Sequence, residues 1–433
     1  MLTVNGKYLY KDGQRFFYLA DTCWSAFTNL TLPDWKFYLD TRKAQGYTAI
    51  QINLLRQYDS SCPFKGREPF AVVEHDDGSY EYDFSKINTS YFDNVEKMLE
   101  QMNERDMVPS LVLLWGNFVP DTWMSHFVKN NTIPFKHIRS YIQYVVNRFK
   151  KFNPIWFISG DVGFVDNENQ RCEAAIKYYR EVLESAKEVD PDGIYTFHIN
   201  GESYELPDEF KKQISFFSYQ SGHAQTGQNT AFIIPQKLRK SGYEGPIVDA
   251  EICYEGLQKM HSQYPERYSA FEVRKAAWRA VLAGADMGVG YGAFGLWPLK
   301  DNSRPESKLA KLLPFKLMPY DWRQCLQFRG ANDMGFLKNI VLKYAPNGFS
   351  PIENVCDENS GIVAAENDNY KFIYLPMAQD FELKDLADHA KSVKIIDLKN
   401  RTFVEPQIKE DTLYMPFVVE DMLVIIETEK KNG

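Results

Sequence analysis

The sequence predicts an α/β protein: a (β/α)8 TIM barrel followed by a small all-β sandwich domain. Short apolar runs alternate with amphipathic segments over about the first 300 of the 433 residues, as parallel strands joined by helices do. After about residue 340 the segments are β-rich and separated by polar turns, with little helical spacing. We therefore expect a barrel domain over residues 1–340 and a sandwich over residues 341–433.

The chain opens with a predicted β-hairpin that belongs to the barrel domain. Residues 4–10 and 15–19 are strand-like, and the segment Lys11-Asp12-Gly13-Gln14 between them is a turn signal.

Eight apolar runs follow as candidate barrel strands. Between them, apolar residues recur in steps of three and four over 92–102, 138–149 and 176–186, which predicts helices. Thr31 has the character of a helix start, and Gly46 that of a helix end. The predicted strands cover residues 16–20, 49–55, 108–114, 155–158, 194–199, 214–219, 247–250 and 287–290.

A doubly wound sheet is the competing α/β fold, and it requires a glycine-rich phosphate-binding turn after its first strand. The corresponding turn, residues 21–24, contains no glycine. Residues 290–295 fit the pattern G-x-G-x-x-G, but Leu296-Trp297-Pro298 follows where a dinucleotide site needs a helix start. The barrel is favoured, and no cofactor is expected.

The composition excludes several classes of partner. Lys plus Arg number 50 and Asp plus Glu 58, a net charge of −8, whereas nucleic-acid grooves carry a basic stripe. No apolar stretch reaches the length of about 18–20 residues that spans a membrane, and the first residues, Met1 to Gly6, do not have the pattern of a signal peptide. The six cysteines form no C-x-x-C motif. We expect a cytoplasmic protein without nucleic-acid or membrane partners; the oligomeric state is left open.

Polar and aromatic residues gather at the ends of the predicted strands, where a barrel enzyme carries its chemistry. Aromatic residues make up 15% of the chain, and such rings stack on the faces of sugars. This combination predicts a pocket for a glycoside, either a small molecule or an oligosaccharide. The expected substrate-binding residues are Asp21, Trp24, Gln51, Asn53, Trp115, His198, Gln220, His223, Tyr291 and Trp297.

Two carboxylates stand out among these strand ends. Asp161 follows the fourth run and Glu251 the seventh, so they lie nearly opposite each other across the barrel. Glycoside hydrolysis uses such a pair, one to protonate the leaving oxygen and one to meet the oxocarbenium-like carbon. Ion pairs with arginine or helix caps are the structural alternative. Asp249 points to the same side as Glu251, and Tyr254 and Glu255 are candidates to orient it.

Two other functions remain open from the residues alone. His198 and His223 are candidate zinc ligands of a metal-dependent hydrolase, although no H-x-H or H-E-x-x-H motif occurs. A catalytically inactive barrel that only binds carbohydrate is the second alternative.

Several ordered segments resemble the apiosidase-like family of (β/α)8 glycoside hydrolases. They are residues 16–24, 46–51, 159–161, 220–223, 249–255 and 291–297. The resemblance implies retaining hydrolysis of a terminal furanosyl residue, apiose in the best-known members, with Asp161 as acid/base and Glu251 as nucleophile. The β-rich tail resembles the sandwich often appended in that family, sometimes named a collagen-binding domain.

These interpretations combine into a geometric expectation. We expect an exo-acting enzyme whose blind pocket holds about one sugar between the rings of Trp24, Trp115, Tyr291 and Trp297. Retention requires carboxyl groups about 5–5.5 Å apart. The sandwich is expected to be a structural companion of the barrel.

Overall fold

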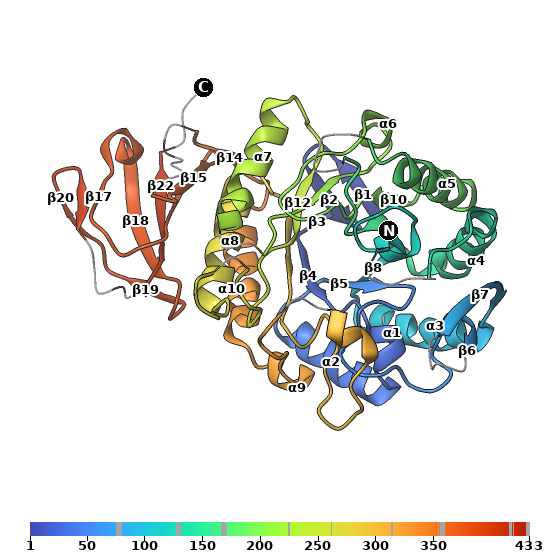
Figure 1. Cartoon of the computed structure of the whole chain (residues 1–433). Helices are drawn as coiled ribbons and strands as arrows, with labels where there is room; N and C mark the ends of the chain where they lie inside the picture. Colours follow the sequence, from blue (N-terminus) through green and yellow to red (C-terminus); the bar gives the residue numbers. More distant parts are fainter. Residues whose placement is uncertain are drawn as a thin grey trace.

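The computed structural model describes residues 1–429 except 75–79, 127–130, 166–170, 224–225, 261, 313–314, 354, 356–359, 415–417 and 419. Figure 1 shows a strand-and-helix barrel with an all-β unit at one side.

Eight parallel strands form the barrel, and the predicted fold class is confirmed. Their order in the sheet is β10-β9-β8-β5-β4-β13-β12-β11, so strands that follow each other in this set along the chain are neighbours in space. The first and the last strand pair in parallel. The strands are β4 (Tyr18–Thr22), β5 (Ala49–Asn53), β8 (Val108–Trp115), β9 (Ile155–Gly160), β10 (Ile194–Thr196), β11 (Phe217–Gln220), β12 (Ile247–Glu251) and β13 (Gly288–Tyr291).

The wall between β10 and β11 is joined differently from the rest. Ser215 N donates to Tyr195 O at 2.7 Å. Two hydroxyls make further links: Tyr195 N donates to Ser215 Oγ at 3.0 Å, and Thr196 Oγ1 donates to Phe216 O at 2.8 Å. We call this wall the seam.

Helices surround the strands (Figure 1) and present to them the apolar faces that the sequence predicts. In α3, α4 and α5 the apolar residues at helical spacing are buried. Thr31 caps α2, because its side chain accepts from Asp34 N at 3.2 Å. Gly46 ends that helix with a φ of +91°, which glycine adopts at little cost.

The helices are α1 (Ala26–Asn29), α2 (Leu32–Ala44), α3 (Thr89–Asn103), α4 (Ile138–Phe149), α5 (Glu173–Val189), α6 (Asp208–Lys211), α7 (Thr230–Lys240), α8 (Ala270–Leu282), α9 (Trp322–Cys325) and α10 (Arg329–Tyr344). Short 3-10 turns cover Gly116–Phe118, Phe135–His137, Lys150–Phe152, Thr226–Asn229, Lys308–Leu312 and Lys384–Ala387. Within the described residues, no helix combines the length and the apolar character that a membrane span needs.

The N-terminus differs from the predicted hairpin. The single strand expected over residues 4–10 is divided at Gly6, whose φ is +56°. A three-stranded sheet results, with β1 (Leu2–Asn5), β2 (Tyr8–Lys11) and β3 (Gln14–Phe16). A second hairpin, β6 (Phe70–Glu74) with β7 (Tyr80–Ile87), follows β5 and was not expected.

The C-terminal region is the predicted β-sandwich. A six-stranded sheet, in the order β14-β15-β16-β22-β18-β19, and a three-stranded sheet, β17-β21-β20, enclose a separate apolar core. The strands are β14 (Ser350–Pro351), β15 (Val363–Glu366), β16 (Tyr370–Leu375), β17 (Phe381–Glu382), β18 (Ala390–Asp397), β19 (Thr402–Val404), β20 (Gln407–Lys409), β21 (Thr412–Tyr414) and β22 (Met422–Thr428).

A buried arginine joins the sandwich to the barrel. Arg274 of α8 binds Asp333 of α10 at 2.9 Å, and from the sandwich Asp421 at 2.5 Å and Glu420 at 3.0 Å. Tyr374 OH donates to Asp421 at 3.0 Å. We call these residues the interface cluster. Figure 1 shows the sandwich beside α7, α8 and α10.

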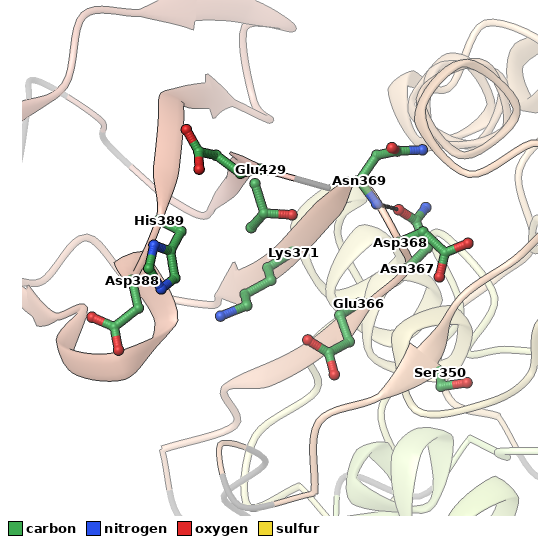
Figure 2. A pocket seen from close by; sticks show the side chains of 10 residues that line it. Ser350, Glu366, Asn367, Asp368, Asn369, Lys371, Asp388, His389 and Glu429 are labelled. Carbon is green, nitrogen blue, oxygen red and sulfur yellow. Dashed lines mark hydrogen bonds between the residues drawn. The ribbon is translucent and has the colours of Figure 1, made fainter. Parts of the chain in front are cut away.

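A cleft of about 840 Å³ opens on the sandwich (Figure 2). Its described lining contains no Phe, Tyr or Trp and consists of Ser350, Glu366, Asn367, Asp368, Asn369, Lys371, Asp388, His389, Thr428 and Glu429.

Candidate active site

The two predicted catalytic carboxylates lie at the carboxyl ends of two barrel strands. Glu251 is the last residue of β12, and its side chain is only 6% exposed. Asp161 directly follows β9 and is half-buried.

The backbone at Asp161 has a strained conformation, which directs its N–H group to His198. Its φ is +49°, a left-handed conformation that side chains other than glycine adopt at a cost of about 1–3 kcal/mol. In this conformation Asp161 N donates to His198 Nδ1 at 3.3 Å. The preceding Gly160 lies under Trp115, where a Cβ atom would come within 2.2 Å of the indole ring. The sequence Gly-Asp therefore fits both the ring above it and the turn after it.

Two histidines face Glu251. His223 Nε2 lies 2.8 Å from Oε1, and His198 Nε2 lies 3.2 Å from Oε2. Because Nδ1 of His198 accepts the Asp161 N–H, the proton of its neutral ring is on Nε2, the atom that faces Glu251. The His198 ring thus connects the main chain of one carboxylate residue to the side chain of the other.

The surroundings of the two carboxyls shift their pKa values in opposite directions. Burial, together with the charge of Glu251, raises the pKa of Asp161 to about 6. Burial also acts to raise the pKa of Glu251, but the interactions with His198 and His223 outweigh it and lower that pKa to about 2. At mildly acidic pH, Glu251 is a carboxylate while Asp161 holds a proton.

Gln220 fixes the orientation of the acid. Its Nε2 donates to Asp161 Oδ1 at 2.9 Å and to Ile199 O at 2.6 Å. It comes from the end of β11, so that both sides of the seam contribute to the site.

Aromatic rings form one side of the site. The rings of Trp24 and Trp115 meet edge to face at 4.9 Å, and Trp24 also meets His198 at 5.3 Å. Trp24 Nε1 donates to Tyr254 OH at 3.1 Å, and the Tyr254 ring lies 4.5 Å from that of His223. These contacts place Tyr254 beside His223, and its role in orienting Glu251 stays a prediction.

Several buried polar atoms at or after the carboxyl ends of barrel strands have no hydrogen-bond partner among the described residues. Such atoms are uncommon in folded proteins and ask for an explanation. They include Asn53 Nδ2, Asn117 Oδ1, His198 Nε2, His223 Nδ1 and Trp297 Nε1.

The structure places three of the expected substrate-binding residues in other surroundings. Asp21 is fully buried and accepts from Arg42 Nε at 2.6 Å and from Tyr38 OH at 2.7 Å. Tyr291 OH donates to Glu255 Oε2 at 2.6 Å, and Gly330 N donates to the same oxygen at 3.0 Å. The expected role of Glu255 in orienting Glu251 stays a prediction.

Gln51 is the third of these residues. Its Nε2 donates to Ala250 O at 2.7 Å, a bond inside the barrel that ties β5 to the residue before Glu251. Asp249 lies two residues before Glu251 on β12. Its Oδ1 accepts from Ser221 N, in the loop after β11, at 3.1 Å.

Sequence reasoning missed two residues beside Asp161. Trp123 Nε1 donates to the main-chain oxygen of Asp161 at 3.1 Å. The charge of Asp161, after burial, contributes to a raised pKa of Tyr58. Both residues come from loops after barrel strands and belong to no motif, so only their position in the loops could have drawn attention to them. No group of three or more His, Cys, Asp or Glu arranged to hold a metal occurs in the part of the chain that the structure describes.

Comparison with known sequences gives one family. Residues 3–346 match the family described as apiosidase-like, catalytic domain. No curated protein matches the chain.

Comparison with solved structures shows what the fold is similar to. A glycoside hydrolase with 18% identity superposes with a TM-score of 0.78 and covers 100% of this chain and 97% of its own. A family 5 glycoside hydrolase from Bacteroides vulgatus has 20% identity and a TM-score of 0.76, covering 100% of this chain and 94% of its own. At these identities the likeness concerns the fold.

Proposed function

The chain belongs to the apiosidase-like family of glycoside hydrolases, and from this premise we propose that it is an exo-acting, retaining enzyme that releases a terminal furanosyl sugar. Apiose is the sugar we propose first, carried by a plant glycan or a smaller plant glycoside. The hydrolysis of O-glycosidic bonds follows from family membership; the sugar, the exo action and the stereochemistry are the proposal.

The observation that supports two-carboxylate hydrolysis is the opposite ionisation of the two carboxyls, while retention is proposed from the family resemblance. Both retaining and inverting mechanisms need one ionised and one protonated carboxyl in one site. The pKa values of about 2 for Glu251 and about 6 for Asp161 meet this requirement. Where the surroundings of two titratable groups separate their pKa values in this way, the group with the lower pKa acts as the nucleophile or base and the other as the acid.

The reaction proceeds in two steps. Glu251 attacks the anomeric carbon while Asp161 gives its proton to the leaving oxygen, and a glycosyl ester with Glu251 forms. Asp161, now ionised, takes a proton from water, which attacks the same carbon and frees Glu251. Gln220 holds Asp161 Oδ1 through both steps.

The unpartnered buried atoms support recognition of a polyol. His223 Nε2 faces the Glu251 carboxylate, and Nδ1 of the same ring has no partner among the described residues. Asn53 Nδ2 and Trp297 Nε1 are donors. These ring and amide nitrogens suit sugar hydroxyls, which both donate and accept. The aromatic wall of Trp24 and Trp115 supports a small sugar against one face.

A substrate panel tests the proposal. Nitrophenyl furanosides, nitrophenyl pyranosides and plant glycosides are supplied to the full chain, and the first-formed product is followed by NMR. We expect release of a single furanose with retained anomeric configuration. An inverted product, or release of internal oligosaccharides only, contradicts the mechanism or the exo action respectively.

Azide distinguishes the roles of the two carboxylates. In Asp161→Ala, azide enters the vacated position, attacks the glycosyl-enzyme and gives a glycosyl azide of retained configuration. In Glu251→Ala, it replaces the nucleophile directly and gives an inverted azide. The opposite pairing of variant and product shows that the roles are exchanged.

A further inference from the structure

The short loop that carries His223 is bound at its first residue by two groups from other elements. The loop consists of Ser221, Gly222 and His223, directly after β11, and we call it the histidine loop. Ser221 N donates to Asp249 Oδ1 at 3.1 Å, and Ser221 O accepts from Thr230 Oγ1 at 2.5 Å. Both main-chain groups of this buried serine therefore have a partner.

Tyr268 binds the other end of the histidine loop. Its OH donates to His223 O at 2.5 Å, and the tyrosine is itself buried, two residues before α8. Between the two ends, Gly222 has a φ of +87°, which glycine adopts at little cost. A Cβ atom at this position would come within 2.5 Å of the Glu202 side chain. The backbone of the loop is thus held on each side of a turn that suits glycine.

Asp249 is a buried acid that has no ion pair with a cation among the described residues. Asp286, at the amino end of β13, is also buried, but it pairs with Arg239 at 3.2 Å. Burial raises the pKa of Asp249 to about 7, although hydrogen bonds with Ser221 act to lower it. At mildly acidic pH it is a neutral acid whose oxygen accepts the Ser221 N–H. A buried acid of this kind next to a reaction site is a candidate for a functional role.

The histidine loop determines how His223 meets the nucleophile. His223 Nε2 lies 2.8 Å from Glu251 Oε1. Burial acts to raise the pKa of Glu251, and the interactions with His198 and His223 lower it to about 2. The charge of Glu251 also acts, after burial, on the pKa values of Asp161 and Tyr254, which are the other titratable groups that face it. A displaced loop would therefore change the ionisation of Glu251 without any change in Glu251 itself.

We propose that Asp249 and Tyr268 are positioning residues for the nucleophile: they hold the histidine loop so that His223 stays against Glu251. This inference rests on the proposed function for the role of Glu251. Asp249 acts through the main chain of Ser221, and Tyr268 acts through the carbonyl of His223. Neither residue needs to touch the reacting atoms.

Removal of the acceptor at Asp249 tests the proposal in turnover. For Asp249→Ala we expect kcat per folded molecule to fall about 10²-fold on the nitrophenyl glycoside of the sugar found in the panel, because a displaced catalytic group costs about this factor. KM should change less than about threefold. Asp249→Asn keeps an acceptor oxygen and resembles the protonated acid, so it should restore most of kcat. An unchanged kcat in Asp249→Ala overturns the proposal.

The matched control for this variant is Asp286→Ala. It also removes a buried acid, but at the opposite end of the barrel, and its kcat per folded molecule should equal that of the wild type. A loss in Asp286→Ala as large as that in Asp249→Ala overturns the proposal, because any buried acid would then have the same effect.

Tyr268→Phe tests the other end of the loop with a milder change, and it carries the test if Asp249→Ala does not fold. It removes only the hydroxyl that donates to His223 O, so we expect kcat to fall about fivefold, as the loss of one hydrogen bond implies. The control is Tyr141→Phe, since the Tyr141 hydroxyl also donates to a main-chain oxygen, that of Leu113, at 3.0 Å. Equal values of kcat in the two tyrosine variants contradict a specific role of Tyr268.

The acid limb of the pH profile separates positioning from a general loss of structure. If His223 moves away from Glu251, the pKa of Glu251 rises. The limb of kcat/KM near pH 2 should then move up by about one pH unit or more in Asp249→Ala, and it should stay in place in Asp249→Asn and Asp286→Ala. A limb that stays in place in Asp249→Ala while kcat falls shows that the effect does not pass through His223, and it overturns the proposal.

Nitrogen-15 NMR of the histidine rings keeps this result distinct from the proposed function, because it needs no substrate. The His223 signals of the full chain are assigned by their absence in His223→Asn. We expect them to shift in Asp249→Ala and in Tyr268→Phe, and to keep their wild-type positions in Asp286→Ala. Shifted signals in a protein that hydrolyses nothing on the panel support the positioning role while the proposed function fails. Unshifted signals in an active enzyme overturn the positioning role alone.

Discussion

Two groups of buried carboxylates in this protein differ in the partners that surround them. In the interface cluster, Arg274 contacts Asp333, Glu420 and Asp421, so three acids share one permanent cation. In the active site, histidines face Glu251, and a glutamine holds Asp161. Burial, together with the charge of Glu251, raises the pKa of Asp161 to about 6, so this carboxyl exchanges its proton near neutrality. The first arrangement joins the sandwich to the barrel, and the second allows a proton to move.

The largest expected effect is on turnover in the active site. Glu251→Gln should lower kcat by about 10⁴-fold or more, because no glycosyl ester can form on an amide. The matched variant in the interface cluster is Asp333→Asn, which also converts a buried acid to its amide. Its kcat per folded molecule should equal that of the wild type, as measured on a nitrophenyl glycoside. A comparable loss in both variants would remove the distinction between the clusters.

The next largest effect is on the free energy of unfolding. Arg274→Met leaves the carboxyls of Asp333 and Asp421 buried without their cation, which should cost about 3–5 kcal/mol. Urea denaturation of the full chain measures it. Arg139→Met, which breaks ion pairs of a side chain that is 47% exposed, should cost at most about 1 kcal/mol. If the two arginine variants are equally stable, the interface cluster does not hold the sandwich to the barrel.

The pH profile reports the proton-exchanging cluster. Hydrolysis needs ionised Glu251 and protonated Asp161, so kcat/KM should fall below pH about 2 and above pH about 6, following the pKa values of these groups. Above the upper pKa we expect a tenfold loss for each pH unit. Asp161→Asn should remove the upper limb on a nitrophenyl glycoside. An upper limb that persists in that variant would assign it to another group.

The smallest effect concerns a residue whose contacts are structural. Tyr291→Phe removes the hydroxyl that donates to Glu255, while Gly330 N still donates to the same oxygen at 3.0 Å. The expected loss of stability is about 1 kcal/mol, and kcat/KM should be unchanged. A drop in kcat/KM at unchanged stability would return Tyr291 to the substrate pocket.

The sequence was sufficient to predict the barrel because eight short apolar runs alternate with other segments, three of which have clear helical periodicity. Asp161 and His223 follow two of those runs, and Glu251 ends another. They lie close together because all parallel strands of a barrel have their carboxyl ends at the same rim. The short predicted strand near residue 194 was also correct, although a seam joins it to its neighbour.

The direction of individual side chains could not be predicted in the same way. Asp21 and Tyr291 are register partners on β4 and β13, and partners across parallel strands point to the same side of the sheet. Both side chains face the helices. There Arg42 forms an ion pair with Asp21 and lies over the ring of Tyr291. A shift of one residue exchanges the two faces of a strand, and a strand end read from sequence is uncertain by more than that. The positions of Tyr58 and Trp123 beside Asp161 could not be predicted either, because they depend on how the loops fold.

The seam between β10 and β11 divides the residues that support the two catalytic carboxyls. His198 follows one of its strands, and Gln220 ends the other, so the ring beside Glu251 and the amide that binds Asp161 stand on opposite sides of a wall that hydroxyl contacts help to join. Local opening is concentrated where few main-chain bonds must break. The seam is therefore a place in the barrel where a small movement would alter the spacing of the two carboxyls without unfolding a strand.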